Sequence, residues 1–234
     1  MDALGQTEAR ADSLYDLYEK TAAKFNMPVY NTIGNHEVFG LYKESGISPD
    51  HPEYGKKMYE NRIGDGKTYY SYDFKGWHFM CLDGIGYTEN RHYYGKIDSV
   101  QMEWIQQDLA KVSKETPIIV STHIPFYSII EQAESGATSA LHQAAAITNN
   151  VEVLDLFDGY NLKLVLQGHL HIVEDIFFNG IHYITAGAVS ARWWEGPRMG
   201  FEEGFVVVEV RGDDFDWHYE DYGWEAVEEE ETIE

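Results

Sequence analysis

Apolar residues recur along this 234-residue chain with two spacings, one typical of helices and one typical of strands. Spacing of three and four residues predicts helices over 14–25, 99–114 and 151–157, with Asn149 or Asn150 as the N-cap of the third. Short apolar or alternating runs predict strands over 28–33, 67–74, 77–82, 117–121, 162–167, 176–178, 181–186, 204–210 and 217–224. Helices that alternate with short apolar strands indicate an α/β layered domain.

Polar side chains follow three of the predicted strands. Asn35 and His36 follow 28–33, His123 follows 117–121, and His169 and His171 follow 162–167. Because ligands bind at the carboxyl ends of strands in α/β sheets, we expect these side chains to converge on one pocket. Imidazole nitrogens and amide oxygens suit Zn, Mn or Fe. One histidine alone is more often a hydrogen-bonded core or surface residue, but the three segments together predict a metal or catalytic site.

The charge of the chain is strongly negative and uneven. With 40 acidic and 17 basic side chains the formal net charge is −23, which argues against binding to nucleic acids or anionic membranes. Hydrophobic residues at 44% and aromatic residues at 15% exclude a disordered polymer. Because eleven acids and no Lys or Arg fall within 213–234, we divide the chain into a domain over 1–212 and an acidic strand and tail over 213–234. Glu228–Glu231 is expected to be a solvated tail.

Several other classes of site and segment are absent from the sequence. Cys81 is the only cysteine, which excludes an intrachain disulfide and a cysteine-rich metal site. No P-loop, G-x-S-x-G or H-E-x-x-H motif is present. No apolar run is long enough for a membrane span, and we expect a soluble protein, cytoplasmic or exported, with any signal peptide upstream of Met1.

Three motifs resemble the later motifs of the calcineurin-like metallophosphoesterase family: Gly34-Asn35-His36-Glu37, Thr122-His123 and Gly168-His169-Leu170-His171. The resemblance covers roughly 25–210. It implies a four-layer αββα sandwich that hydrolyses phosphate mono- or diesters with two divalent transition metals, Mn, Fe or Zn. By motif position, Asn35, His123 and His169 would ligate the second metal and His171 the first. His36 would contact the phosphoryl group or protonate the leaving oxygen as the catalytic residue.

The sequence departs from the family pattern before Gly34, where the D-x-H and G-D-x-x-D segments are missing. The second metal keeps three of its four family ligands and the first metal only one. We therefore expect that this sequence starts inside a longer one, with Met1-Asp2 as the end of the second missing segment, and translation of the DNA upstream of Met1 tests this. Such an N-terminally truncated fold would hold one metal or none and would self-associate through an open sheet edge.

Two adjacent tryptophans stand in a Gly- and Pro-containing loop after the last motif. The functional interpretation is that Trp193 and Trp194 form a wall of the substrate site, with Arg192 near a phosphate; the alternative is that they cap the hydrophobic core. The sequence thus leaves two functions open. One is a phosphohydrolase that acts on a small-molecule phosphate ester. The other is a non-catalytic or single-metal binding module on the same fold.

Overall fold

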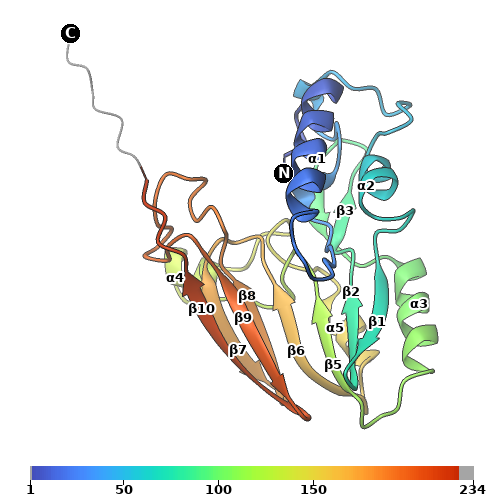
Figure 1. The fold of residues 1–234 in the computed structure, drawn as a ribbon, viewed down its shortest axis with the longest axis vertical. Coiled ribbons are helices and arrows are strands. Elements are labelled where there is room, and N and C mark those ends of the chain that lie inside the picture. The colour runs from blue at the N-terminus through green and yellow to red at the C-terminus, as the bar shows by residue number, and fades with distance from the viewer. Residues whose placement is uncertain (1, 227–234) are drawn as a thin grey trace.

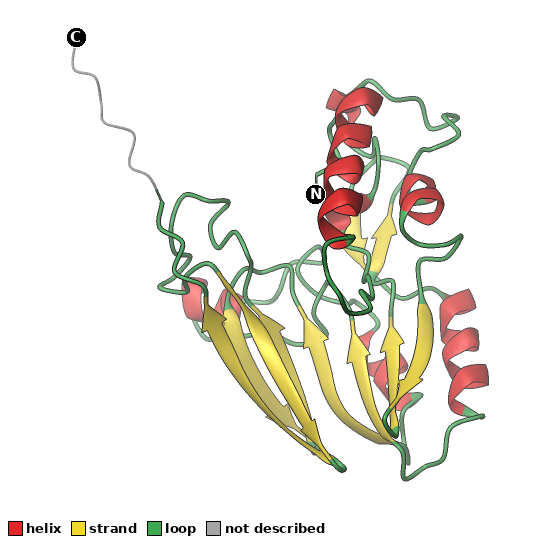
Figure 2. Ribbon diagram, in the orientation of Figure 1, coloured by secondary structure: helices red, strands yellow, loops and turns green. Residues whose placement is uncertain are grey.

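The computed structural model describes residues 2–226 and shows a mixed α/β fold around one six-stranded sheet (Figure 1; Figure 2). The expected tail at Glu228–Glu231 lies outside the described residues. None of the helices between residues 2 and 226 combines the length and apolar character that crossing a bilayer needs. In chain order the elements are α1 (Glu8–Ala22), the 3-10 helices η1 (Asn35–Glu37) and η2 (Lys43–Ser45), α2 (Lys57–Arg62), β1 (Tyr70–Phe74), β2 (Trp77–Cys81), β3 (Ile85–Tyr87), β4 (Tyr93–Gly95), α3 (Ser99–Leu109), β5 (Pro117–Ser121), α4 (Ile130–Ser135), α5 (Asn150–Asp155), β6 (Asn161–Gln167), β7 (Val173–Phe178), β8 (Ile181–Ala186), β9 (Gly204–Arg211) and β10 (Asp214–Asp221).

Four parallel strands form the centre of the sheet. The strand order is β1-β2-β5-β6-β8-β7, in which β2, β5, β6 and β8 run parallel while β1 and β7 run antiparallel at the two edges. The first four residues of β5 are fully buried, as its continuous apolar run predicts. Since parallel strands end at one edge of the sheet, the loops that carry His123 and His169 begin side by side there (Figure 1).

Helices cover one face of the sheet. Ile105 and Leu109 of α3 and Val153 of α5 share a core with Val120 of β5 and Val165 of β6, all of them buried. The helical spacing of 99–114 brings these apolar side chains onto one side of α3. The helix ends at Leu109, earlier than the sequence predicts.

The β9–β10 hairpin packs against the opposite face of the sheet. Its apolar side chains contact Ile119 of β5 and Leu164 of β6, and the Trp77 Nε1–H donates a hydrogen bond to the carbonyl of Gly212 at 2.7 Å. A mixed α/β fold with a central sheet is therefore confirmed, while the four-layer αββα arrangement stays a prediction. β9 and β10 pair along their whole length across the boundary expected between 212 and 213, so residues on both sides of it belong to one ladder.

The prediction of a strand over 28–33 is wrong. This segment belongs to none of the sheets. Tyrosine side chains take the place of a partner strand, because the Asn31 carbonyl accepts hydrogen bonds from the hydroxyls of Tyr59 at 3.2 Å and Tyr70 at 3.0 Å. The hydroxyl of Tyr18 also donates to Asn31 Oδ1. The segment is thus fixed by side chains as it leads into Asn35.

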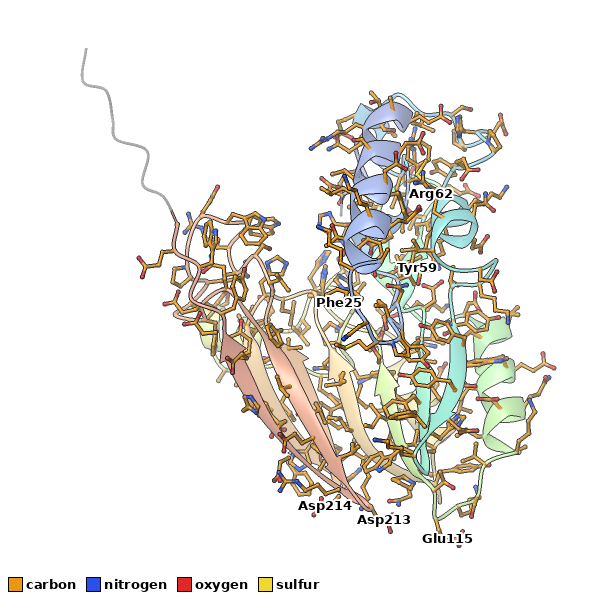
Figure 3. The ribbon with its side chains drawn as sticks, in the orientation of Figure 1. Phe25, Tyr59, Arg62, Glu115, Asp213 and Asp214 are labelled. Carbon is orange, nitrogen blue, oxygen red and sulfur yellow. The ribbon has the colours of Figure 1, made fainter. Side chains whose placement is uncertain are left out.

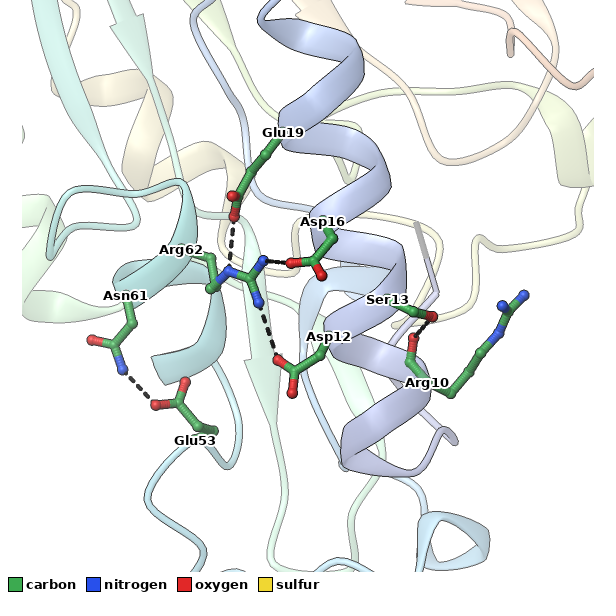
Figure 4. Close-up of polar contacts among 8 residues, drawn as sticks. All are labelled: Arg10, Asp12, Ser13, Asp16, Glu19, Glu53, Asn61 and Arg62. Atoms are coloured by element: carbon green, nitrogen blue, oxygen red, sulfur yellow. Dashed lines mark hydrogen bonds and ion pairs between the residues drawn. The ribbon is translucent and has the colours of Figure 1, made fainter.

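Helix α1 is tethered to α2 by one arginine. Figure 4 shows Arg62 among three carboxylates of α1, with Nε 2.8 Å from Glu19 and Nη1 3.1 Å from Asp12, and with Asp16 as the third partner. These carboxylates raise the pKa of Arg62 above its usual range, the hydrogen bond to Glu19 contributing most. Arg10 lies on the other side of α1 (Figure 4). The tether therefore fixes the helix from one side and leaves the side of Arg10 open.

Candidate metal and phosphate site

Three predicted ligand side chains meet at the carboxyl ends of the central strands. His123 follows β5, His169 follows β6, and Asn35 lies in η1. His123 Nε2 lies 2.8 Å from Asn35 Oδ1 and 3.2 Å from His169 Nδ1. Side chains that are 88 and 46 residues apart in sequence are thus brought within hydrogen-bond distance.

Burial keeps both of these imidazoles neutral. The pKa of His123 lies well below its usual range, first because burial disfavours the charged ring and then because His169 and other histidines are close. Burial is also the main cause that lowers the pKa of His169, to about 4. At pH 7 each ring therefore keeps a lone pair that can bind a metal ion.

His171 stands in the same loop with its ring oriented by the backbone. His169 and His171 have φ of 71° and 59°, a left-handed conformation that costs a non-glycine residue about 1–2 kcal/mol. His171 Nδ1 donates to the carbonyl of Ala191 at 2.6 Å, which leaves Nε2 free. Metal-ligating histidines are commonly oriented by such a bond from their second nitrogen.

Arg198 is a cation beside this loop that the sequence reasoning missed. Its backbone pairs with that of Phe201, and Phe201 packs against Leu170, which lies between the two histidines. After burial, the positive charge of Arg198 adds to the causes that lower the pKa of His169 and His171. Within residues 2–226 the buried Nε–H of Arg198 has no acceptor. Arg198 Nη2 lies 4.0 Å from Glu134 Oε1, so its charge is partly balanced by this carboxylate.

His36 contacts Asp2 and lines the cavity described below. Its Nδ1 lies 3.2 Å from Asp2 Oδ1, and its side chain is 38% exposed. The hydrogen bond with His36 is the main cause that lowers the pKa of Asp2. Asp2 therefore holds the imidazole ring in place, a role that the sequence reasoning did not assign to it.

Glu37 stabilises the turn that carries Asn35 and His36. The Gly34 N–H donates to Glu37 Oε2 at 2.7 Å, and the Tyr15 hydroxyl donates to the Glu37 carbonyl at 3.1 Å. Burial raises the pKa of the Glu37 carboxyl above its usual range. Glu37 thus fixes the backbone at the start of η1.

Two separations among the donor atoms of Asn35, His123 and His169 are compatible with a shared divalent ion. Metal–ligand bonds of about 2.1 Å place neighbouring ligand atoms about 3.0–3.4 Å apart in octahedral or tetrahedral sites. The observed separations of 2.8 and 3.2 Å are close to these values. Across the described part of the chain no group of three or more His, Cys, Asp or Glu side chains is placed to hold a metal, so this group depends on the amide of Asn35, and no group is present for a second ion. The dinuclear site that the resemblance implies is not confirmed.

A cavity of about 580 Å³ opens beside His123. His36, Glu37, His123 and His171 line its floor, and three residues at the N-terminal end of the chain form one wall: Gln6, Arg10 and Leu14. Ser190, Trp193 and Trp194 form the facing wall, next to Asp2. Sequence reasoning missed the α1 wall, although Arg10 and Leu14 are four residues apart and so share one helical face.

Two charged groups lie outside this cavity. Arg192 is 61% exposed, pairs with Glu195 at 3.3 Å and is not among the lining residues, whereas Arg10 is one of them. Figure 3 places Asp213 and Asp214 at the far end of the sheet from the histidine loops, in the turn of the β9–β10 hairpin. These acids cannot replace the missing carboxylates.

Curated relatives with phosphatase and phosphodiesterase names match much of this chain. This chain is 28% identical over 167 residues to purple acid phosphatase 22 of Arabidopsis thaliana. The match covers 70% of this chain and 34% of that protein. The chain is 23% identical over 184 residues to a probable cyclic nucleotide phosphodiesterase of Rhodococcus erythropolis, which covers 79% of this chain and 53% of that protein. The chain thus spans about a third to a half of the length of these relatives.

The fold also matches a solved structure. A dimetal phosphatase from Danio rerio superposes with a TM-score of 0.59 and 14% identity over 89% of this chain and 74% of that one, a likeness of fold alone. The family described as calcineurin-like phosphoesterase matches residues 6–173, which is more than half of the sequence and includes all three histidine motifs. The chain therefore belongs to the calcineurin-like phosphoesterases, a family of hydrolases.

Proposed function

We propose that this protein hydrolyses phosphate mono- or diesters of small molecules in a metal-dependent reaction. The observation that carries the proposal is the convergence of Asn35 Oδ1, His123 Nε2 and His169 Nδ1 in a chain of this family, with His123 also lining the cavity. The neutral imidazoles support it, because a metal ion binds the unprotonated ring.

Asn35, His123 and His169 would hold one divalent ion of the Mn, Fe or Zn type. Such an ion supplies positive charge that neutralises the oxygens of the phosphoryl group. In a chain that also contains the D-x-H and G-D-x-x-D segments, the proposal extends to a dinuclear site in which His171 ligates the other ion.

The chain's own residues bind the ester and move the proton. His36, held by Asp2, protonates the oxygen of the leaving alcohol. Arg10 supplies a positive charge to the anionic substrate from the α1 wall, and Trp193 and Trp194 form the opposite wall. Arg192, turned toward Glu195, plays a smaller part in substrate binding.

A metal-exchange assay tests the proposal. After a chelator has removed any bound metal, the protein is expected to bind Mn²⁺ or Zn²⁺ in calorimetry. It is expected to hydrolyse 4-nitrophenyl phosphate or its bis-ester only after metal is added back. His123→Ala is expected to remove both properties, while His218→Ala, in an exposed histidine of β10, keeps them. Metal binding without hydrolysis would favour the alternative, a single-metal binding module. A chain that neither binds metal nor hydrolyses the ester would contradict both the hydrolase and the binding module.

We also propose that two copies associate through the free edge of β7. Within the described residues β7 pairs only with β8, and Phe177 and Phe178 are 64% and 51% exposed. Sedimentation velocity is expected to show a dimer that Phe177→Lys dissociates, while Phe205→Lys on the exposed side of β9 leaves it intact. A chain that stays monomeric as its concentration rises argues against this edge.

A further inference from the structure

The cavity over the histidines is larger than a phosphoryl group requires. Its volume of about 580 Å³ lies within the range of small-molecule sites. The part beyond the histidine floor, between α1 and the loop at 190–194, therefore receives the alcohol portion of an ester. This inference rests on the proposed function and concerns which alcohol the site accepts.

Two indole rings face this part of the cavity. Trp193 is 56% exposed, and its ring lies 4.8 Å from that of His171 at an angle of 41°. Trp194 is 50% exposed and is supported from behind by Trp224, at 5.2 Å between centroids and 71° between planes. Each indole is thus packed on one side and open on another.

The backbone that carries the two indoles adopts a conformation that residues other than glycine disfavour. Ala191, Trp193 and Trp194 have φ of 36°, 52° and 69°, in the region that bulky residues rarely adopt. Local hydrogen bonds fix the turn, with Trp194 N–H donating to Ser190 O at 2.8 Å and Arg192 N–H donating to Gly196 O at 3.1 Å. Strained backbone of this kind clusters at active sites, ligand clamps and switch regions.

The facing wall complements an anionic molecule that carries a ring. Leu14 gives it an apolar side chain and Arg10 a positive charge. Figure 4 shows the Arg10 side chain directed away from the Arg62 cluster, on the other side of α1. A planar ring can therefore stack on Trp193 while the phosphate of the same molecule stays near the histidines and the cation.

We propose that the substrate is a phosphate ester whose alcohol portion carries a planar aromatic ring, and that Trp193 selects it by stacking. Ring stacking adds to hydrophobic burial because the π systems attract each other in offset or tilted geometries. A saturated ring of the same size is at least as apolar but has no π system, so it cannot stack in this way. The preference of the site for the planar ring is therefore a measure of stacking.

Two phosphonates, which cannot be hydrolysed, make a matched pair for the test. Calorimetric titration with benzylphosphonate and with cyclohexylmethylphosphonate, both in the presence of Mn²⁺, is expected to show about threefold to tenfold tighter binding of the benzyl compound. Trp193→Leu is expected to abolish that ratio and Trp193→Phe to retain most of it. Trp104→Leu, in a tryptophan of α3 outside this cavity, serves as the control and leaves the ratio unchanged.

Three results would overturn the proposal: equal binding of the two phosphonates, a ratio that survives in Trp193→Leu, or no binding of benzylphosphonate. Trp193→Phe shows whether a loss in the leucine variant comes from the ring or from misfolding. Because the phosphonates are only bound, a chain that prefers the benzyl compound but hydrolyses no ester refutes the proposed function and not the aromatic site. A chain that hydrolyses esters without this preference refutes the aromatic site alone.

Discussion

Replacement of His36 by alanine is expected to lower kcat by about 10²- to 10⁴-fold for an ester with a poor leaving group, the usual contribution of a general acid. The ring is placed for this task, since it lines the cavity between Asp2 and the floor histidines. It is not one of the three side chains whose donor atoms converge, which are Asn35, His123 and His169, so its removal is expected to leave metal binding intact. KM is expected to change little.

The dependence on the leaving group separates this role from a structural one. Nitrophenolate departs without a proton, so kcat for 4-nitrophenyl phosphate is expected to fall far less in His36→Ala than kcat for an unactivated aryl or alkyl ester. The measurement is kcat for a series of esters ordered by the pKa of the alcohol, with the metal content of each variant determined alongside. His218→Ala is again the control. An equal loss for every ester would contradict proton donation and point to a defect in binding or folding.

Sequence patterns located most of the sheet, because buried parallel strands leave a strong apolar signal. The runs at 117–121 and 162–167 became β5 and β6 almost residue for residue, and the histidines after them converge. The segment at 28–33 also contains apolar residues, but it has no partner strand. The sequence of a segment does not show whether a partner strand lies beside it. Strand formation depends on a neighbour, whereas apolar character depends only on the residue.

The cavity wall could not be derived from the sequence for a different reason. Arg10 and Leu14 share a helical face, but that face is identified as part of the site only once α1 is placed beside α2 and the segment that carries His36. The placement depends on long-range contacts such as those of Arg62 with Asp12 and Glu19, which leave no local pattern. The sequence places Asp2 only at the end of a missing motif, because its contact with His36 spans 34 residues and leaves no local pattern.

The second large effect is expected at Asp83, which forms a buried ion pair at the end of β2. Lys56 Nζ lies 2.6 Å from Asp83 Oδ2, Asp83 is 4% exposed, and the Ile85 N–H donates to Asp83 Oδ1 at 3.0 Å. Gln101 of α3 bonds both the N–H and the carbonyl of Asp83, at 2.9 and 2.8 Å. The contacts of Asp83 therefore join the end of β2, α3 and the segment before α2. The chain that follows Asp83 leads to β4, where the ring of Tyr93 packs edge-on against that of His169.

Asp83→Asn is expected to lower the free energy of unfolding by about 3 kcal/mol, because it leaves the Lys56 ammonium largely buried without a counter-charge. The same substitution at Asp216, whose pair with Arg211 is exposed, is expected to cost less than about 1 kcal/mol. Urea unfolding followed by circular dichroism measures both. In a Lys56→Met background, where no charge is left unpaired, the cost of Asp83→Asn should fall by more than half. Equal costs at Asp83 and Asp216, or no recovery in that background, would show that the pair does not hold this part of the fold, and that the loop under His169 depends on Gln101 instead.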